Sequence, residues 1–215
     1  MDERTTGIIL RIRLLTDTSL IVQWMTPDLG RIATVAKGAR RPKSPLAGKL
    51  DLFFLAELSF QRSRRSDLHT LREIALRETT ALLRHDLQYL RQASYAAQLI
   101  EQTTETETPI PNIFSLMLDF LRFLPQLPAQ PLAIFAFELK LLTELGLGPD
   151  PAAHPLTAGA RQVVLNLVRL PWPALLPLRM TPAQVDEVKG FLYRNLAEHL
   201  GKVLPGRAAA LAENR

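Results

Sequence analysis

The sequence predicts an α+β protein in which β-strands come first and α-helices follow. Apolar residues alternate with polar ones up to about residue 79, and from residue 80 onward they recur at helical spacing. The charge changes at the same place: residues 1–80 hold 14 Lys and Arg against 9 Asp and Glu, whereas residues 81–215 hold 12 of each. We therefore expect two domains, a small β-barrel over residues 1–79 and an all-helical domain over residues 80–215.

The barrel is predicted from four or five short strands joined by turns and one long loop. The four clear strands cover residues 8–14, 19–25, 31–37 and 50–61. TPDLG, which ends at Gly30, has turn chemistry between the second and third strands. LHTLREIAL, residues 68–76, fits either a fifth strand or a short helix.

Four helices are predicted beyond residue 80. They cover residues 84–102, a second run from Asn112 as N-cap to residue 124, a third from near Pro131 to Gly146, and a last one from Thr181 as N-cap to Gly201. Between the last two lies a proline-rich span at about residues 147–180, which we expect to be irregular.

Composition excludes several classes of protein. The hydrophobic content of 47% is that of a globular chain with a sizeable core, and the absence of cysteine rules out disulfides, thiolate metal sites and a cysteine nucleophile. No secretory signal is visible after MDERTTG, and the most apolar later stretch carries Glu138, Lys140 and Glu144, too many charges for a membrane span. We expect a soluble, cytoplasmic protein with no membrane contact.

The positive charge is concentrated in one part of the predicted barrel. Residues 31–65 hold nine basic residues against Asp51 and Glu57. Five of the nine lie in the long loop VAKGARRPKSPLAGK, residues 35–49, between two apolar strands. A segregated basic patch of this kind is typical of a protein that binds a polyanion.

Three blocks of the sequence resemble the RecO family of bacterial DNA repair and recombination-mediator proteins. The first begins at Gly30 and includes VAKGARR and a Ser-x-Leu-x-Gly element formed by Ser44, Leu46 and Gly48. The second is FELKLLTELGLGP, residues 137–149, and the third is LYRNLAEHLGKVLPGR, residues 192–207. Together the blocks span most of the chain in the family's order.

The resemblance implies a five-stranded OB-fold barrel followed by a helical domain. It also implies that the protein binds single- and double-stranded DNA, anneals complementary strands and, with RecR and the acidic tail of single-strand-binding protein, helps to load RecA. Such a protein would act in the cytoplasm, at the nucleoid.

Two positions depart from the family pattern. Many relatives carry a four-cysteine zinc site after the second block, whereas residues 149–162 here contain no cysteine and a single histidine, His154. We therefore expect no metal, and apolar packing by Val163, Leu165, Leu167 and Trp172. Relatives often have a basic residue before the Phe-Glu-Leu, where this chain has Ala136. A contact of that base with the single-strand-binding-protein tail would therefore be absent or moved.

The basic residues of the barrel are the predicted DNA contacts. OB-folds bind oligonucleotides on one face and at rim loops, where Lys and Arg neutralise phosphates without reading bases. Glycines at 38 and 48 permit positive φ, and two prolines reduce the entropy lost on ordering the loop. The predicted set is Arg31, Lys37, Arg40, Arg41, Lys43, Lys49, Arg62, Arg64 and Arg65.

Plainer interpretations apply to several of these residues. The loop could be a solvated surface that only aids solubility, and QRSRRSD, residues 61–67, fits a hairpin turn as well as a DNA contact. Trp24, Phe53 and Phe54 could stack on bases, but core packing is the favoured interpretation. The histidines at 69, 85 and 199 are expected at the surface or at helix ends.

No catalytic pattern is found. Acidic residues are scattered singly, KGARRPKS lacks the Gly-Lys-Ser/Thr ending of a nucleotide-phosphate loop, and no Gly-x-Ser-x-Gly element occurs. We expect a non-enzymatic DNA-binding mediator with no ATP use and no cofactor. The alternatives are an adaptor whose basic loop binds an acidic protein tail, and an RNA-binding OB-fold protein.

Overall fold

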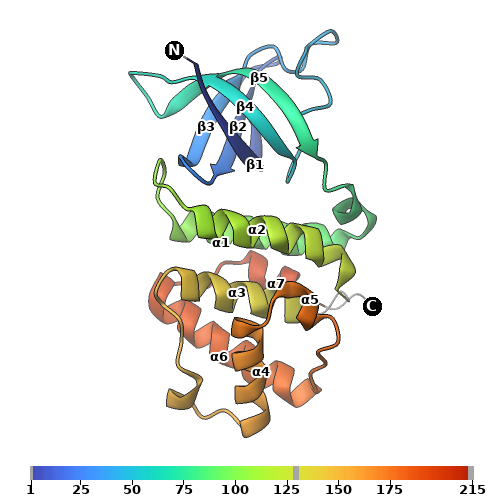
Figure 1. The fold of residues 1–215 in the computed structure, drawn as a ribbon, viewed down its shortest axis with the longest axis vertical. Coiled ribbons are helices and arrows are strands. Elements are labelled where there is room, and N and C mark those ends of the chain that lie inside the picture. The colour runs from blue at the N-terminus through green and yellow to red at the C-terminus, as the bar shows by residue number, and fades with distance from the viewer. Residues whose placement is uncertain (1, 128–130, 213–215) are drawn as a thin grey trace. The chain divides into compact units, whose positions relative to one another are not determined.

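The computed structural model describes residues 2–127 and 131–212 and divides into two compact units (Figure 1). The first, here called the barrel unit, comprises residues 1–81 and 104–115, and the second, the helical unit, comprises residues 82–103 and 116–215. Segment 104–115, which the predicted division places in the helical domain, packs with the barrel.

The described part of the barrel unit holds five strands that close into a barrel in the order β1-β2-β3-β5-β4. They are β1 (Asp2–Leu14), β2 (Leu20–Thr26), β3 (Gly30–Ala36), β4 (Leu55–Gln61) and β5 (Leu68–Glu78), coloured from dark blue to green in Figure 1. All pairs are antiparallel except β3 with β5, which pair in parallel. This topology confirms the OB-fold, and LHTLREIAL is a strand.

The long strand β1 closes the barrel by pairing on both sides. Its first half pairs with β4, as far as Ile8 opposite Leu55, and its second half pairs with β2, as far as Leu14 opposite Leu20. The register shifts between Ile9 and Arg11, where a bulge bends the strand. β1 therefore hydrogen-bonds to both β4 and β2, so neither of these two strands has an unpaired edge on the side of β1.

The aromatic residues of the barrel are core residues, as the sequence favoured. Trp24 is 0% exposed, Phe53 1% and Phe54 9%. The indole Nε1 of Trp24 donates a hydrogen bond to Thr34 Oγ1 at 2.9 Å, so the buried polar atom is satisfied. Stacking on bases by these three residues would require the core to open.

The fourth strand begins later than predicted. Residues 50–54 were expected in the strand, but β4 starts at Leu55 because Phe53 has a φ of +65°, outside the extended region. Its backbone N–H donates to Ile9 O at 2.8 Å, and its ring is buried. Burial of the side chain and this hydrogen bond stabilise the unusual backbone angle.

The helices follow in chain order. They are α1 (Leu87–Thr103), α2 (Pro111–Phe123), α3 (Leu132–Glu144), α4 (Ala158–Arg169), α5 (Trp172–Leu175), α6 (Pro182–Leu200) and α7 (Gly206–Ala210), with short 3-10 turns at Ala81–His85, Leu124–Gln126 and Pro151–Ala153. Asn112 is inside α2 and is not its N-cap, because Pro111 already occupies the first helical position. Thr181 caps α6 in a capping box with Gln184, and Gly201 ends it at a φ of +69°, as predicted.

The span expected to be irregular contains a regular helix, α4. Thr157 begins it by accepting a hydrogen bond from Ala160 N at 3.2 Å, a cap that the prolines of residues 149–155 just before it obscured in the sequence. Of the residues expected to pack this region, Val163, Leu167 and Trp172 are buried, whereas Leu165 is only partly buried. His154 lies edge-on to the Phe191 ring, with 4.9 Å between the ring centroids.

None of the helices in the described ranges has the length and apolarity needed to cross a bilayer. The most apolar of them, α3, is instead the centre of the helical unit: every residue from Leu132 to Leu139 is buried, including Glu138. A helix that is apolar on all sides is typical of a buried core helix.

Candidate nucleic-acid interface

The predicted basic loop connects β3 to β4 and is folded as a series of tight turns. Its backbone N–H groups bond to carbonyls three residues earlier at Arg41, Ser44, Ala47 and Lys49, with N···O distances of 3.0–3.2 Å. Two of its glycines, at positions 38 and 48, have φ of +65° and +72°, as predicted. The loop is therefore an ordered structure that presents its side chains in fixed directions.

Two apolar side chains anchor this loop to the barrel. Ala39 is 8% exposed and Leu46 is 7% exposed, and both belong to the cluster of buried residues inside the barrel. Between these anchors the chain must pass over the surface, which leaves Arg40, Arg41 and Lys43 exposed. Lys37, just before the first anchor, is exposed as well.

The exposed cations of the loop are not neutralised by any residue that the structure describes. The side chains of Lys37, Arg41 and Lys43 make no hydrogen bond or ion pair with any residue in the described ranges. Arg40 donates to the backbone carbonyl of Asp17 at 3.0 Å, which fixes the side chain beside the turn between β1 and β2 but leaves its charge uncompensated. The result is a group of four cations on one loop with no acidic partner in the part of the chain that the structure describes.

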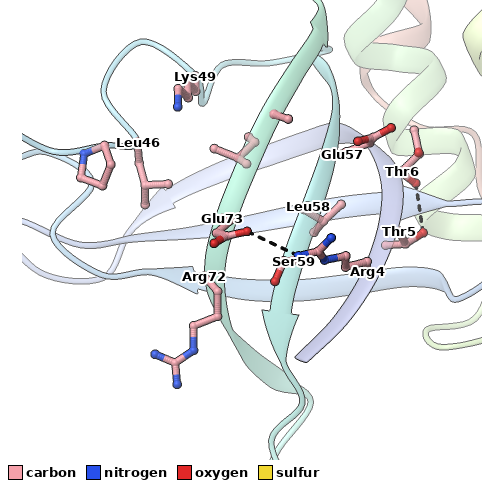
Figure 2. Close-up of a pocket in the computed structure, with 13 residues that line it drawn as sticks. Arg4, Thr5, Thr6, Leu46, Lys49, Glu57, Leu58, Ser59, Arg72 and Glu73 are labelled. Carbon is pink, nitrogen blue, oxygen red and sulfur yellow. Dashed lines mark hydrogen bonds and ion pairs between the residues drawn. The ribbon is translucent and has the colours of Figure 1, made fainter. Parts of the chain in front are cut away.

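Lys49, the last cation of the loop, lies in a groove of about 660 Å³ on the barrel (Figure 2). The groove is lined by Arg4, Thr5, Thr6, Pro45, Leu46, Lys49, Glu57, Leu58, Ser59, Arg72, Glu73, Ile74 and Ala75. Its charges are mixed: Arg4 Nη2 lies 3.9 Å from Glu73 Oε2, and Glu57 pairs with Arg77 at 2.5 Å. Lys49 and Arg72 have no acidic partner in the described structure, so the groove adds positive charge to that of the loop.

The sequence analysis did not identify Arg4 and Arg72 as residues near the loop. Arg4 lies opposite Ser59, which in turn lies opposite Glu73. Arg72 donates to the side chain of Gln61. Strand register places Arg4 and Glu73 on one face, which alternation could have predicted. Arg72 joins them only because the register shifts between Ser59 and Phe60 and leaves the adjacent Arg72 and Glu73 both exposed, which alternation could not predict.

Two of the predicted DNA contacts are already bound inside the barrel unit. Arg31 Nε donates to Thr104 Oγ1 at 2.8 Å, and its guanidinium also reaches the Thr104 carbonyl. Arg62 binds Glu3 through two bonds of 2.7 and 3.0 Å and Glu107 at 2.9 Å. The hydrogen bond from Arg62 lowers the pKa of the Glu3 carboxyl, and that same bond raises the pKa of Arg62.

The remaining predicted contacts, Arg64 and Arg65, are exposed in the hairpin between β4 and β5. Neither has an ionic partner in the part of the chain that the structure describes. DNA contact by these two residues stays a prediction, whereas Arg31 and Arg62 would have to exchange internal bonds to make one.

His69 is not at the surface, contrary to the sequence prediction. It is 1% exposed, and its ring stacks on Phe60 with 5.2 Å between the centroids. It lies opposite the buried Thr34 on β3, so strand pairing directs its side chain inward. Among the described residues, no three His, Asp or Glu side chains are grouped as a metal site would require.

Comparison with known sequences identifies the family. Residues 1–80 match the family model "Recombination protein O N terminal", and residues 84–154 match "Recombination protein O C terminal". The chain belongs to the RecO family. The first two sequence blocks that resembled RecO lie within the matched residues, whereas the third, residues 192–207, lies beyond them and its resemblance stays a prediction.

Individual RecO proteins are similar over about two thirds of this chain. The chain is 30% identical over 147 residues to the DNA repair protein RecO of Bacillus pumilus, a match that covers 68% of this chain and 57% of that protein. It is 35% identical over 151 residues to the DNA repair protein RecO of Symbiobacterium thermophilum, covering 68% and 58%. The match therefore spans a little more than half the length of these RecO relatives.

Proposed function

We propose that this chain is a DNA-binding protein of repair and recombination that holds nucleic acid through the basic loop of its OB-fold barrel. The observation that carries the proposal is the group formed by Lys37, Arg40, Arg41 and Lys43, which are exposed and have no acidic partner in the described structure. Membership of the RecO family and the name "DNA repair protein RecO" of its relatives support the same function.

The proposed contacts are to phosphates and carry no sequence information. Each Lys or Arg that meets a phosphate releases condensed counterions, which favours binding at low salt. Because the loop is anchored by two buried residues, it loses little conformational entropy when DNA binds. A protein that holds only the backbone leaves base edges free to pair, which suits annealing of complementary strands.

The finer parts of the proposal rest on the family. We propose that the chain binds single- and double-stranded DNA, anneals complementary strands and, with RecR and the tail of single-strand-binding protein, assists RecA loading at the nucleoid. The helical unit would serve these protein partners. Nothing in this proposal requires a cofactor or a catalytic step.

The test is binding of a fluorescein-labelled single-stranded oligonucleotide, followed by anisotropy at several salt concentrations. The loop variant changes Lys37, Arg40, Arg41 and Lys43 together to Ala. We expect it to bind more weakly and the log–log salt slope to become shallower by roughly 3, at ~0.7 for each lost phosphate contact. Circular dichroism checks that the variant is folded.

A matched control removes the same charge elsewhere. Four exposed residues of the helical unit, Arg91, Lys189, Arg194 and Lys202, changed together to Ala, lower the net charge by the same amount and should leave the slope unchanged. If both variants behave alike, the loop is not the DNA site. If the wild type binds a poly-glutamate peptide and no oligonucleotide, the adaptor function replaces the proposed one, and preference for an RNA oligonucleotide of equal length would indicate an RNA-binding protein.

A further inference from the structure

The segment that joins α1 to α2, residues 104–110, lies along the start of β3 in the barrel unit. We call it the strap. Thr106 forms a parallel bridge with Arg31, the Glu107 N–H donates to Arg31 O at 3.0 Å, and the Ile110 N–H donates to Pro27 O at 3.2 Å. These backbone contacts fix where the side chain of Glu107 lies.

The carboxylate of Glu107 lies between two nitrogen groups of the barrel. Its Oε2 accepts a hydrogen bond from Arg62 Nη1 at 2.9 Å, and its Oε1 lies 3.1 Å from His69 Nε2. The backbone N–H of Ser63 donates to His69 Nδ1 at 3.4 Å, so a neutral ring carries its proton on Nε2, the atom that faces Glu107. Each oxygen of one anion thus meets a different donor.

The unsatisfied Nε2 of His69 indicates a ligand site and not only a packing contact. Its ring is 1% exposed, and Nε2 lacks a hydrogen bond of acceptable geometry within the described structure despite the 3.1 Å approach of Glu107. A buried N–H that is incompletely satisfied is costly. An oxyanion that can approach along the N–H direction would satisfy it better than Glu107, whose position the strap backbone constrains.

The Glu107 carboxylate, which lies against Arg62 and His69, is accessible from solvent. The Glu107 side chain is 38% exposed, and its neighbours on the strap from Glu105 to Pro109 are exposed as well. Arg64 and Arg65, two and three residues beyond Arg62, are exposed cations of the same hairpin. A polyanion that reaches these arginines would pass close to the Glu107 carboxylate.

We propose that Arg62 and His69 form an oxyanion site, which Glu107 occupies in the free protein and a nucleic-acid phosphate occupies in the complex. The two non-bridging oxygens of a phosphodiester can meet the same two donors as the two carboxylate oxygens. Glu107 is then an internal competitor that weakens DNA binding until the strap carboxylate is displaced. This inference rests on the proposed function, because it concerns how the same barrel regulates its hold on DNA.

The test compares two variants of the strap that change the charge equally. Glu107→Gln removes the competing carboxylate with almost no change of shape, and Glu105→Gln removes an exposed carboxylate that has no partner in the described structure. For Glu107→Gln we expect roughly fivefold to tenfold tighter binding of a single-stranded oligonucleotide at each salt concentration, with an unchanged salt slope because the wild-type complex already makes the phosphate contact. Glu105→Gln should leave the affinity close to that of the wild type.

A second variant of Glu107 keeps the net charge of the protein. Glu107→Asp shortens the side chain by one methylene, so the carboxylate can no longer reach both donors, and it should also bind DNA more tightly than the wild type. The gain of Glu107→Gln should disappear when Arg62 is changed to Gln in the same chain. Melting temperatures confirm that each variant is folded.

The outcomes separate this inference from the proposed function. If the wild type binds the oligonucleotide through the loop but both Glu107 variants behave like Glu105→Gln, the strap is structural and the inference is wrong. Weaker binding by Glu107→Gln would also overturn it. If the wild type itself binds no oligonucleotide, the proposed function fails first.

Discussion

The guanidinium of Arg207 lies across both carboxylate oxygens of Glu138, with Nε at 2.7 Å from Oε1 and Nη2 at 2.9 Å from Oε2. Glu138 is 0% exposed in the middle of α3, and Arg207 is 4% exposed at the start of α7. The Tyr95 hydroxyl donates to Oε1 at 2.6 Å. Because Glu138 is the buried carboxylate of α3, it needs these partners, and the requirement ties α7 to the centre of the helical unit.

Removal of Arg207 should strongly destabilise the helical unit. Arg207→Met keeps much of the side-chain volume but leaves a buried carboxylate without its counterion, and we expect a loss of about 3–5 kcal/mol in the free energy of unfolding. The measurement is urea unfolding followed by circular dichroism. The matched control Arg194→Met removes an exposed arginine and should change the free energy by less than about 0.5 kcal/mol.

The double variant tests whether the cost belongs to the unpaired charge. Glu138→Gln combined with Arg207→Met removes both charges and should be more stable than Arg207→Met alone. Equal stability of Arg207→Met and Arg194→Met would show that the ion pair does not hold α7 in place.

The hydroxyl of Tyr95 should make the protein sensitive to alkali. Burial, and then the neighbouring Glu138 charge, raise the pKa of Tyr95 well above its ordinary value. Above pH ~10 the unfolded chain loses the phenolic proton while the folded chain keeps it, so the unfolded state binds fewer protons and stability falls as pH rises. For one such group the slope is about 1.4 kcal/mol per pH unit.

Comparison with Tyr95→Phe isolates this contribution. The variant lacks the hydrogen bond to Glu138 and should be less stable than the wild type at pH 7 by about 1.5–3 kcal/mol. The difference should shrink between about pH 10 and pH 11, as measured by urea unfolding at each pH. The exposed Tyr193→Phe serves as control, and a wild-type advantage that does not change with pH would contradict the assignment.

Local signals in the sequence were sufficient for the order of elements. Alternation in β1 to β3 and the cap at Thr181 depend on neighbouring residues only, and the structure confirms both. The charge of the basic loop could be read in the same way, since its residues are contiguous. The start of β4 could not be predicted from neighbouring residues, because the backbone N–H of Phe53 is hydrogen-bonded to Ile9 O on another strand of the barrel.

The state of individual basic residues was beyond the reach of sequence patterns. Arg62 looks like any other cation of QRSRRSD, yet it meets one acidic residue 59 positions earlier and another 45 positions later. The burial of His69 also depends on a long-range contact, the pairing of His69 with Thr34 on β3. A charge count can locate a basic patch, but only tertiary contacts decide which of its charges are already compensated.

The close approach of the strap to β3 explains why position 30 is a glycine, and Gly30→Ala tests that contact. Gly30 has a φ of +68°, and a Cβ there would lie well inside contact distance of the Thr108 backbone. Gly48→Ala is a matched control, because Gly48 has a φ of +72° but nothing within 4 Å of the added Cβ. Both variants pay about 1–2 kcal/mol for an alanine in the left-handed region, and only Gly30→Ala must also displace backbone.

We therefore expect Gly30→Ala to lose clearly more stability in urea unfolding than Gly48→Ala. In hydrogen exchange, the Glu107 and Ile110 amides, which bond to Arg31 O and Pro27 O, should exchange faster in Gly30→Ala and at the wild-type rate in Gly48→Ala. Equal losses of stability with unchanged exchange would mean that the strap adapts to the extra carbon. Faster exchange together with tighter DNA binding would connect displacement of the strap to release of the anion site at Arg62.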